Sequence, residues 1–220
     1  SVLEQRAYSV VYQPIVHLVE NRIVGHEALA RFSAQPQRTP DKWFAEAGLV
    51  GLQQELDVLA PGAFSVGPVL ADQPLARLML EVTEHASVQD YSQLAEALEP
   101  LRSKGLRLAV DDAGAGYASF RHILKLKPDV IKLDSSLIRN VDSDTGCRAL
   151  AAALIRFAEE TGCKVVAEGV ETVEQRYFLI EKMCTLGQGY LFSKPLNTEK
   201  MTALLEDRPF RAGNDLYLNL

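Results

Sequence analysis

The sequence is poor in the features that mark secreted, membrane-spanning and nucleic-acid-binding proteins. Its three cysteines, Cys147, Cys163 and Cys184, form no CxxC pair, which argues against a disulfide framework and favours reduced thiols. No apolar stretch approaches the roughly 18 residues of a membrane span, and the N-terminus does not resemble a signal peptide. The formal net charge of −6 argues against a broad DNA- or RNA-binding surface. We therefore expect a cytoplasmic protein that contacts neither membrane nor nucleic acid.

The bulk composition is that of an ordinary globular protein. Hydrophobic residues make up 47% and charged residues 24% of the 220-residue chain, enough for a sizeable core. We find no internal repeat, low-complexity segment or long Gly/Ser linker, so we expect one domain over residues 1–220 with a tail at 206–220. The acidic balance still permits a small anionic ligand, because divalent cations can lie between carboxylates and a phosphate.

Strand-like apolar runs alternate with helical patterns along the chain, which is typical of βα units and a mostly parallel sheet. Strands are predicted at Val10–Val16, Arg22–Leu29, Ala63–Val66, Arg77–Val82, Leu106–Val110, Val130–Leu133, Lys164–Ala167 and near Leu186. Helices are predicted at Asp41–Leu49, Gly51–Ala60, Tyr91–Lys104, Ala118–Leu126, Thr145–Glu160, Thr172–Lys182 and Thr198–Glu206. Thr172 suits a helix start, and Gly105 and Gly162 suit helix ends.

Polar side chains repeatedly follow these predicted strands. The set comprises Glu81, Glu84, Asp111, Asp112, Lys132, Asp134, Glu168 and Gln188. The carboxyl ends of barrel strands form one rim, so these groups would converge there. Several carboxylates at close range cannot all ionise without cations, and an oxygen-only set suits Mg²⁺ or Mn²⁺ better than zinc. Two such ions about 3.5–4 Å apart would clamp a phosphodiester.

Each of these features also has a simpler interpretation. Asp111-Asp112 alone is more often a helix cap or turn, and Asp112–Gly116 lacks the lysine and serine of a P-loop. Lys132 alone could extend from the barrel rim to solvent. Glu27 is harder to dismiss, because a lone carboxylate inside an apolar strand is costly without a partner. Their joint occurrence at equivalent strand ends favours a site.

Taken in order, the motifs resemble those of the EAL family of cyclic di-GMP phosphodiesterases, from Tyr12 to Leu196. The matching segments are Tyr12–Ile15, Glu27-Ala-Leu29 followed by Arg31, Glu81–Glu84, Asp111–Tyr117, Ile131–Asp134, Ala167–Thr172 and Gln188–Pro195. The resemblance implies a single TIM-like (β/α)8 barrel of the α/β class with an antiparallel first strand. It also implies hydrolysis of cyclic di-GMP, a bacterial second messenger, to linear pGpG by a homodimer.

The resemblance further implies a role for each matching residue. Glu27, Glu81 and Asp111 would hold a first Mg²⁺ or Mn²⁺. Asp111 would bridge to a second ion shared with Asp112 and Glu168. Lys132 and Glu168 would be catalytic, with Lys132 orienting the attacking water. The residues implied to contact or line the substrate are Arg31, Asp134, Glu171 and Gln188, and Glu84 would position the loop after Asp112.

Two departures from the family pattern open an alternative function. Ala113 stands where the family usually has an aromatic residue, in a loop that couples the metal site to the dimer contact. The interval between Asp57 and Glu81 is some two dozen residues shorter than we expect and contains no asparagine, although the family has an asparagine metal ligand there. Ser65–Pro68 resembles that strand without its asparagine.

The short interval has two interpretations. Either the protein lacks this ligand, or residues of the natural chain are missing between about Ala60 and Leu70. We favour the second, since losing most of a βα unit should disrupt a closed barrel, yet every later motif is intact. The alternatives to this enzyme are a non-catalytic cyclic di-GMP receptor, an interaction domain without a nucleotide and a different metal-dependent phosphatase on a similar barrel. A dimer contact is expected around Ala113–Phe120 and the following helix, where Tyr117, Phe120 and Ile123 form an apolar stripe.

Overall fold

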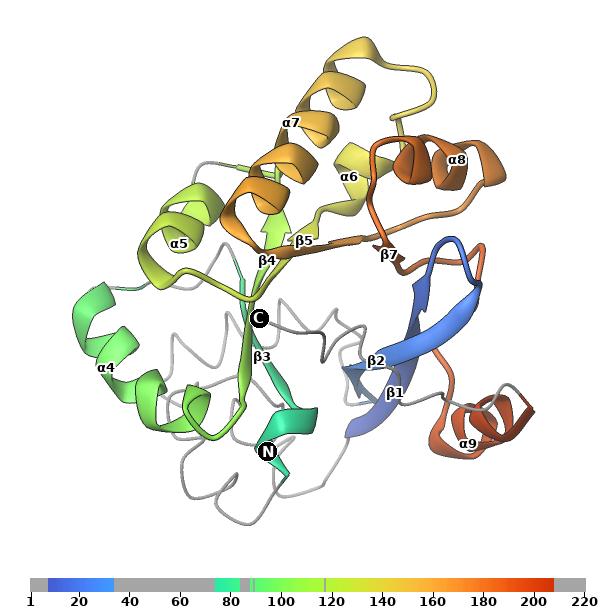
Figure 1. Ribbon diagram of the computed structural model, residues 1–220. Helices are drawn as coiled ribbons and strands as arrows, with labels where there is room; N and C mark the ends of the chain where they lie inside the picture. The colour runs from blue at the N-terminus through green and yellow to red at the C-terminus, as the bar shows by residue number, and fades with distance from the viewer. Residues whose placement is uncertain (1–7, 34–73, 84–87, 89, 117, 208–220) are drawn as a thin grey trace.

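The computed structural model describes residues 8–33, 74–83, 88, 90–116 and 118–207. In this part of the chain seven strands form one sheet in the order β2-β1-β7-β6-β5-β4-β3, and the sheet curls with helices on its outer side (Figure 1). This is the arrangement of a TIM-like α/β barrel, as the sequence predicts. The predicted strand Ala63–Val66 and the predicted helices Asp41–Leu49 and Gly51–Ala60 lie outside the described residues.

The strands fall into an antiparallel and a parallel group. β1 (Tyr8–His17) pairs antiparallel with both β2 (Arg22–Phe32) and β7 (Leu186–Gly187), which confirms the antiparallel first strand. The remaining neighbours pair in parallel. These strands are β3 (Met79–Val82), β4 (Arg107–Ala113), β5 (Val130–Leu133) and β6 (Lys164–Ala167). The parallel strands therefore place their carboxyl ends at one edge.

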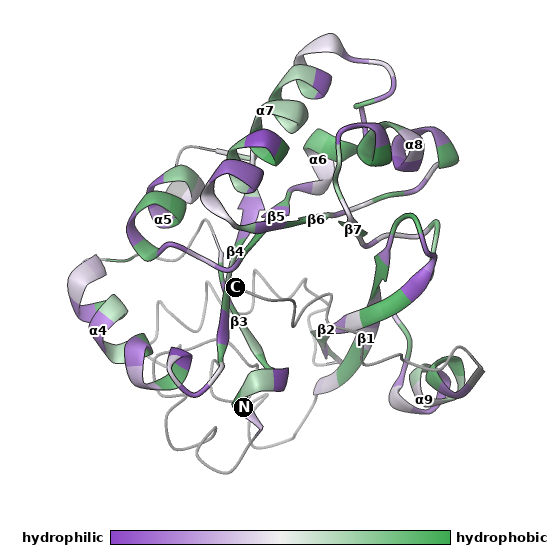
Figure 2. Cartoon of the chain, viewed as in Figure 1, coloured by the Kyte–Doolittle hydropathy of each residue, from purple (hydrophilic) through white to green (hydrophobic). Residues whose placement is uncertain are grey.

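The helices follow the strands and cover the sheet. They are α4 (Tyr91–Arg102), α5 (Ala118–Leu126), α6 (Ser135–Ile138), α7 (Thr145–Thr161), α8 (Val173–Glu181) and α9 (Thr198–Asp207), with a short 3₁₀ turn η1 (Leu75–Arg77). Figure 2 shows both hydrophobic and hydrophilic residues along α5 and α7, as expected for helices with one face on a core. The four-residue α6 and the turn η1 were not predicted, because such short elements contain too few residues to show a period.

Two helix boundaries follow from local chemistry. Thr172 and Gln175 form a capping box at the start of α8, in which each side chain accepts a bond from the other residue's backbone N–H. Gly162 ends α7 in the left-handed conformation with φ 74°, which glycine adopts without steric cost. Both boundaries confirm the interpretation of these residues as helix punctuation.

The main core lies between the parallel strands and helices α6 to α8. It includes Ile131 and Leu133 of β5, Leu154 of α7 and Leu179 of α8, all buried. Burying such a side chain contributes about 1.5–3 kcal/mol relative to exposure. Ile131 and Leu133 pack on one face of β5 and Val130 packs in a second buried cluster on the other, so the polar residue within that strand is held in a set position. No helix in the described part of the chain combines the length and apolar character needed to cross a bilayer.

Candidate functional site

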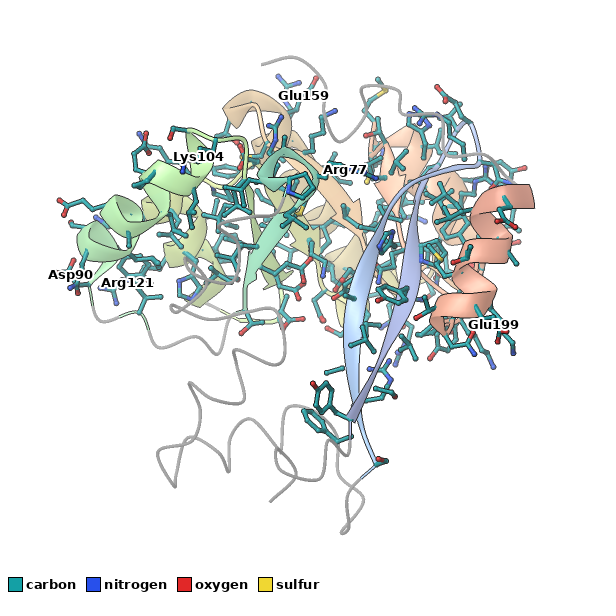
Figure 3. The ribbon with its side chains drawn as sticks, turned by 90° about the horizontal axis from the view of Figure 1, so that it is seen from below. Arg77, Asp90, Lys104, Arg121, Glu159 and Glu199 are labelled. Atoms are coloured by element: carbon teal, nitrogen blue, oxygen red, sulfur yellow. The ribbon has the colours of Figure 1, made fainter. Side chains whose placement is uncertain are left out.

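A buried lysine on β5 is the centre of the site. Lys132 is only 1% exposed, although it carries a charge, and it lies between the apolar residues Ile131 and Leu133. Its Nζ lies 2.9 Å from Glu168 Oε1, and at 3.1–3.2 Å from one oxygen each of Glu27, Glu81 and Asp111. By contrast, the labelled Lys104 and Glu159 lie at the outer surface (Figure 3). Four carboxylates therefore share one ammonium group inside the barrel mouth.

The four carboxylates come from four different strands or strand ends. Glu27 lies on β2, Glu81 on β3 and Asp111 on β4, and Glu168 directly follows β6. The backbone N–H of Glu168 donates to the carbonyl of Leu133 at 3.1 Å, which extends the β5–β6 pairing to the site. The sheet itself thus brings together residues that are far apart in the sequence.

Three of these carboxylates satisfy the geometry of a metal site. One oxygen each of Glu27, Asp111 and Glu168 lies within 4.8 Å of the others. Each carboxylate that contacts Lys132 does so through one oxygen, which leaves its second oxygen for other partners. An oxygen-only donor set at this spacing suits a hard divalent cation such as Mg²⁺ or Mn²⁺. The residues therefore fit the predicted kind of metal centre.

Burial, together with the crowding of charges, shifts the pKa values of the site residues. Burial raises the pKa of Glu168 to about 8; Lys132 opposes this rise, and Asp111 and Glu27 add to it. Burial also raises the pKa of Glu81 to about 7, against the attraction of Lys132. For Lys132, burial alone would lower the pKa, but the surrounding carboxylates, Glu81 foremost, raise it well above its usual value. Lys132 consequently stays protonated at neutral pH.

Asp112 takes an unusual backbone conformation beside the lysine cluster. Its φ is 57°, in the left-handed region, and its N–H donates to Asp111 Oδ1 at 3.0 Å. The β4–β5 register shifts between Val110 and Ala113, where Asp111 and Asp112 lie. Such a bulge re-aims side chains at the end of a strand. Asp112 is thus next to the cluster, while the group of mutually close ligand atoms comprises Glu27, Asp111 and Glu168.

Gln188 joins the cluster from the end of β7. Its Nε2 donates to Glu27 Oε2 at 2.5 Å and to Gln13 Oε1 at 3.2 Å, and Gln13 Nε2 donates to the Ser193 carbonyl at 3.1 Å. Gln13 was missed as a site residue in the sequence. The available signal was a polar residue inside the apolar strand Val10–Val16, the same signal that drew attention to Glu27.

Three predicted substrate residues lie apart from the lysine cluster in their contacts. Arg31 is exposed and donates to the neighbouring Ala30 carbonyl at 2.9 Å. Asp134 caps α6 by accepting from the backbone N–H of Ser136, and the side chain of Glu171 is exposed. Glu84 and the segment Ser65–Pro68 lie outside the described residues.

The apolar stripe predicted for a dimer contact does not share one exposed face. Ile123 is 4% exposed and packs into the main core with α7, whereas Phe120 is 38% exposed. Tyr117 lies outside the described residues. Tyr117 and Ile123 are six residues apart, a spacing that puts two residues of a helix on different faces. Ile123 therefore belongs to the side that faces the core. The exposed apolar partner of Phe120 is instead Leu124, one turn further along α5 and 65% exposed.

A comparison with known protein families identifies the family of the chain. The family model described as "EAL domain" matches residues 69–195, more than half of the chain. The chain belongs to the EAL domain family. Glu27, in the motif that gives the EAL family its name, lies before the matched residues, yet the structure brings it to Lys132 together with Glu81 and Asp111 from within them. The geometry thus connects the two parts of the EAL domain.

Characterised relatives share parts of this EAL domain. The cyclic di-GMP phosphodiesterase NbdA of Pseudomonas aeruginosa is 41% identical over 139 residues, which cover 63% of this chain and 18% of NbdA. The cyclic di-GMP phosphodiesterase RocR of the same organism is 29% identical over 230 residues, covering 88% of this chain and 59% of RocR. The chain therefore spans less than two thirds of these curated relatives.

Solved structures of EAL proteins agree with the fold. The structure of the PaMucR phosphodiesterase in complex with c-di-GMP has a TM-score of 0.77 at 26% identity, with 91% of this chain and 96% of that chain covered. A manganese and cyclic di-GMP complex of Klebsiella pneumoniae BlrP1 has a TM-score of 0.69 at 28% identity, with coverages of 86% and 56%. Both are complexes with the cyclic dinucleotide.

A further relative aligns with nearly the whole chain. The uncharacterised protein Rv1354c of Mycobacterium tuberculosis is 29% identical over 245 positions, covering 94% of this chain and 39% of that protein. Since 94% of this chain is about 207 residues, about 38 of those 245 positions have no residue in it.

Proposed function

We propose that the chain is a metal-dependent phosphodiesterase that hydrolyses cyclic di-GMP to linear pGpG in the cytoplasm. The observation that carries the proposal is the buried Lys132 surrounded by Glu27, Glu81, Asp111 and Glu168. A receptor has no need of a buried ammonium among ionisable carboxylates, whereas hydrolysis of a phosphodiester needs a positioned water and charge stabilisation. The named activities of NbdA and RocR support the same reaction.

The carboxylates would hold two divalent cations. Glu27, Glu81 and Asp111 would bind the first, and Asp111, Asp112 and Glu168 the second. When bound, such ions supply a Lewis acid and a water of lowered pKa. The manganese in the Klebsiella complex supports this class of ion.

Lys132 would act as a fixed positive donor and not as a base. Its pKa is raised well above the usual value by the surrounding carboxylates, so Nζ retains its proton at neutral pH. A protonated ammonium held at 2.9 Å from Glu168 can donate a hydrogen bond to an attacking water that Glu168 also contacts. Arg31, Asp134 and Glu171 would line the dinucleotide, with the Arg31 guanidinium on a phosphate, and Glu84 would position the loop after Asp112.

The proposal is tested by incubating the protein with cyclic di-GMP and Mg²⁺ or Mn²⁺ and separating the products. We expect pGpG with either ion, and suppression by Ca²⁺, whose longer bonds and looser geometry would misplace the water. Turnover that persists unchanged in a chelator would contradict the metal dependence. Glu27→Ala and Asp111→Ala should lose metal binding, whereas Lys132→Ala and Glu168→Ala should lose turnover more than dinucleotide binding.

A non-catalytic receptor for cyclic di-GMP is the second candidate. The observation that favours it is the absence of asparagine between Asp57 and Glu81, together with Ala113 in the loop position usually held by an aromatic residue. Binding of the dinucleotide without product formation, in both Mg²⁺ and Mn²⁺, would establish the receptor and exclude the enzyme.

We also propose that the domain forms a homodimer through α5. Phe120 and Leu124 present two apolar side chains on its outer surface, at 38% and 65% exposure. Light scattering over a range of concentrations should show a dimer for the parent and a monomer for Leu124→Glu. Lys125→Glu, on the same helix, changes charge without removing an apolar contact and serves as the matched control.

A further inference from the structure

A chain of side-chain amides links the last strand, the first strand and the metal-binding carboxylates. The Ser193 carbonyl accepts from Gln13 Nε2, Gln13 Oε1 accepts from Gln188 Nε2, and Glu27 Oε2 accepts from the same Gln188 Nε2. Gln13 is 8% and Gln188 4% exposed, so these bonds form away from bulk water. Gln13 and Glu27 are also direct cross-strand partners in the β1–β2 register.

The Ser193 carbonyl fixes which way the side-chain amides of Gln13 and Gln188 are turned. A backbone carbonyl can only accept, so the Gln13 amide must turn its NH₂ group toward Ser193. Its oxygen then faces Gln188, which must present its own NH₂ group. That NH₂ group lies against Glu27 Oε2, the oxygen that Lys132 does not contact. The orientation at Ser193 is thus transmitted to the carboxylate.

A consequence of this orientation is visible at Gln188. Its Oε1 atom is buried and has no hydrogen-bond partner among the described residues. A flipped Gln188 would bring that oxygen against Glu27 Oε2 and Gln13 Oε1, both of which are acceptors. Such a flip places acceptor against acceptor, which is unfavourable in a buried site. Gln13 Oε1 and Glu27 Oε2 therefore together exclude the alternative orientation of Gln188.

The pairing of β1 with the segment at Leu196 does not depend on the Gln13 side chain. Tyr12 and Leu196 already exchange two backbone hydrogen bonds, of 2.7 and 2.8 Å. The packing of β1 is carried by apolar residues such as Ile15, which lies in a buried cluster with Val166 and Leu186. The polar group of Gln13 is therefore not required to hold the strand in place, which leaves orientation of Gln188 as its contribution.

We infer that Gln13 is a positioning residue of the site, which fixes Gln188 and through it the Glu27 carboxylate. The inference rests on the proposed function in that Glu27 serves as a ligand of a divalent cation. Partners of a ligating side chain typically change metal affinity by about 10–100-fold when they are removed. Because Gln13 acts through Gln188, its removal should have an effect near the lower end of that range.

The first test is a titration with Mn²⁺ alone, followed by calorimetry, so that it does not depend on turnover. We expect Gln13→Leu and Gln188→Leu each to weaken Mn²⁺ binding about tenfold, and the double variant to be no weaker than Gln188→Leu. Ile15→Val, an apolar trimming on the same strand, should leave the affinity within about twofold of the parent. Gln13→Met, with an unbranched side chain of similar length, is the second variant if leucine disturbs the strand.

The second test reads the amide orientation without any metal. In protein labelled with ¹⁵N-glutamine, the side-chain NH₂ signal of Gln188 is assigned by its loss in Gln188→Leu. Its hydrogen exchange should be slow in the parent and at least about tenfold faster in Gln13→Leu, with no change in Ile15→Val.

The outcomes separate this inference from the proposed function. Parent-like Mn²⁺ affinity in Gln13→Leu, or effects of Gln13 and Gln188 that multiply independently, would overturn the positioning role while leaving the metal site intact. A parent that binds no divalent cation would instead contradict the proposed function and the link to metal affinity. In that case the exchange rates still decide whether Gln13 orients Gln188, since unchanged exchange in Gln13→Leu overturns that step.

Discussion

The inner and outer groups of predicted site residues are held in place by different kinds of contact. The inner group comprises Glu27, Glu81, Asp111, Lys132 and Glu168, and the outer group comprises Arg31, Asp134 and Glu171. Inner residues meet across the sheet, as in the bond between Lys132 and Glu27, which are 105 positions apart. The side-chain hydrogen bonds of Arg31 and Asp134, in the outer group, reach only one and two positions along the chain.

This difference separates a preorganised centre from an adjustable rim. The inner side chains cannot move without disturbing several strands, so their geometry is set before any ligand binds. An exposed bond such as that from Arg31 to the Ala30 carbonyl contributes only about 0.5–1.5 kcal/mol. A phosphate can therefore attract Arg31 away from its local partner at little cost. Substitutions in the two groups should consequently affect different measurements.

The largest effect is expected for Lys132→Met, which removes the ammonium and leaves four carboxylates facing one another. Removing one partner of a buried ion pair typically costs about 3–5 kcal/mol. Urea unfolding in a chelator should show this loss of stability, and Mn²⁺ should recover part of it by replacing the missing charge. Lys104→Met at the exposed surface should stay within about 0.5 kcal/mol of the parent.

The next largest effect is expected on the pH dependence of the free energy of unfolding, through Glu168. The pKa of Glu168 is raised from 4.5 to about 8 in the folded protein, so the folded state binds protons more tightly than the unfolded state. The contribution of this group to stability is therefore greatest at low pH and declines as pH rises from about 5 to 8. Glu168→Gln should remove part of this decline, on the order of 1–3 kcal/mol, in urea unfolding with a chelator present. An identical pH profile in parent and variant would show that burial does not perturb Glu168.

A smaller effect, on binding alone, is expected for Arg31→Ala. Loss of a charge-assisted bond to phosphate should weaken cyclic di-GMP binding about tenfold, while the free energy of unfolding changes by less than about 0.5 kcal/mol. Calorimetric titration with the dinucleotide measures the first quantity and urea unfolding the second. Arg31→Lys, which keeps the charge but loses the planar fork, should lie between parent and alanine variant. Unchanged dinucleotide affinity in Arg31→Ala would remove Arg31 from the rim of the site.

The smallest effect is expected for Asp134→Ala, and it sharpens the division between the groups. Loss of the α6 cap should lower the free energy of unfolding by about 0.5–2 kcal/mol. If Asp134 also lines the substrate, as the family resemblance implies, the affinity for cyclic di-GMP should fall as well. Asp134→Asn keeps an N-cap oxygen and should recover most of the stability, so that any remaining loss of affinity reports on the ligand.

The sequence predicted strands well where the core alone decides their extent. Val130–Leu133 and Lys164–Ala167 were predicted to the residue, since each is a short apolar run that the sheet buries. The strand β4 was predicted to end at Val110 but continues to Ala113, because Ala113 pairs with Leu133 beyond a shift in register. A bulge of this kind depends on the neighbouring strand and leaves no period in the sequence.

Most of the candidate site is predictable from polar residues that end or follow an apolar run or, like Glu27, interrupt one. Glu81, Asp111 and Glu168 each follow or end an apolar run, and the structure gathers them around Lys132. Gln13 was not recognised as a site residue because its hydrogen-bond partners, Gln188 and Ser193, lie 175 and 180 positions away in the sequence. Pairing between the first strand and the last is a property of the sheet topology, which no local window of sequence contains.

The pairing of the first and last strands has a consequence for the order in which the protein is made. Glu27 leaves the ribosome 161 residues before Gln188, which at about 5–20 residues per second is a delay on the order of ten seconds. During that time β1 lacks its β7 neighbour, and Glu27 lacks its amide partner. Contacts of such long sequence separation also form slowly. The nascent chain is therefore expected to assemble its carboxylate cluster late, after the parallel strands have folded and the last strand has paired with the first.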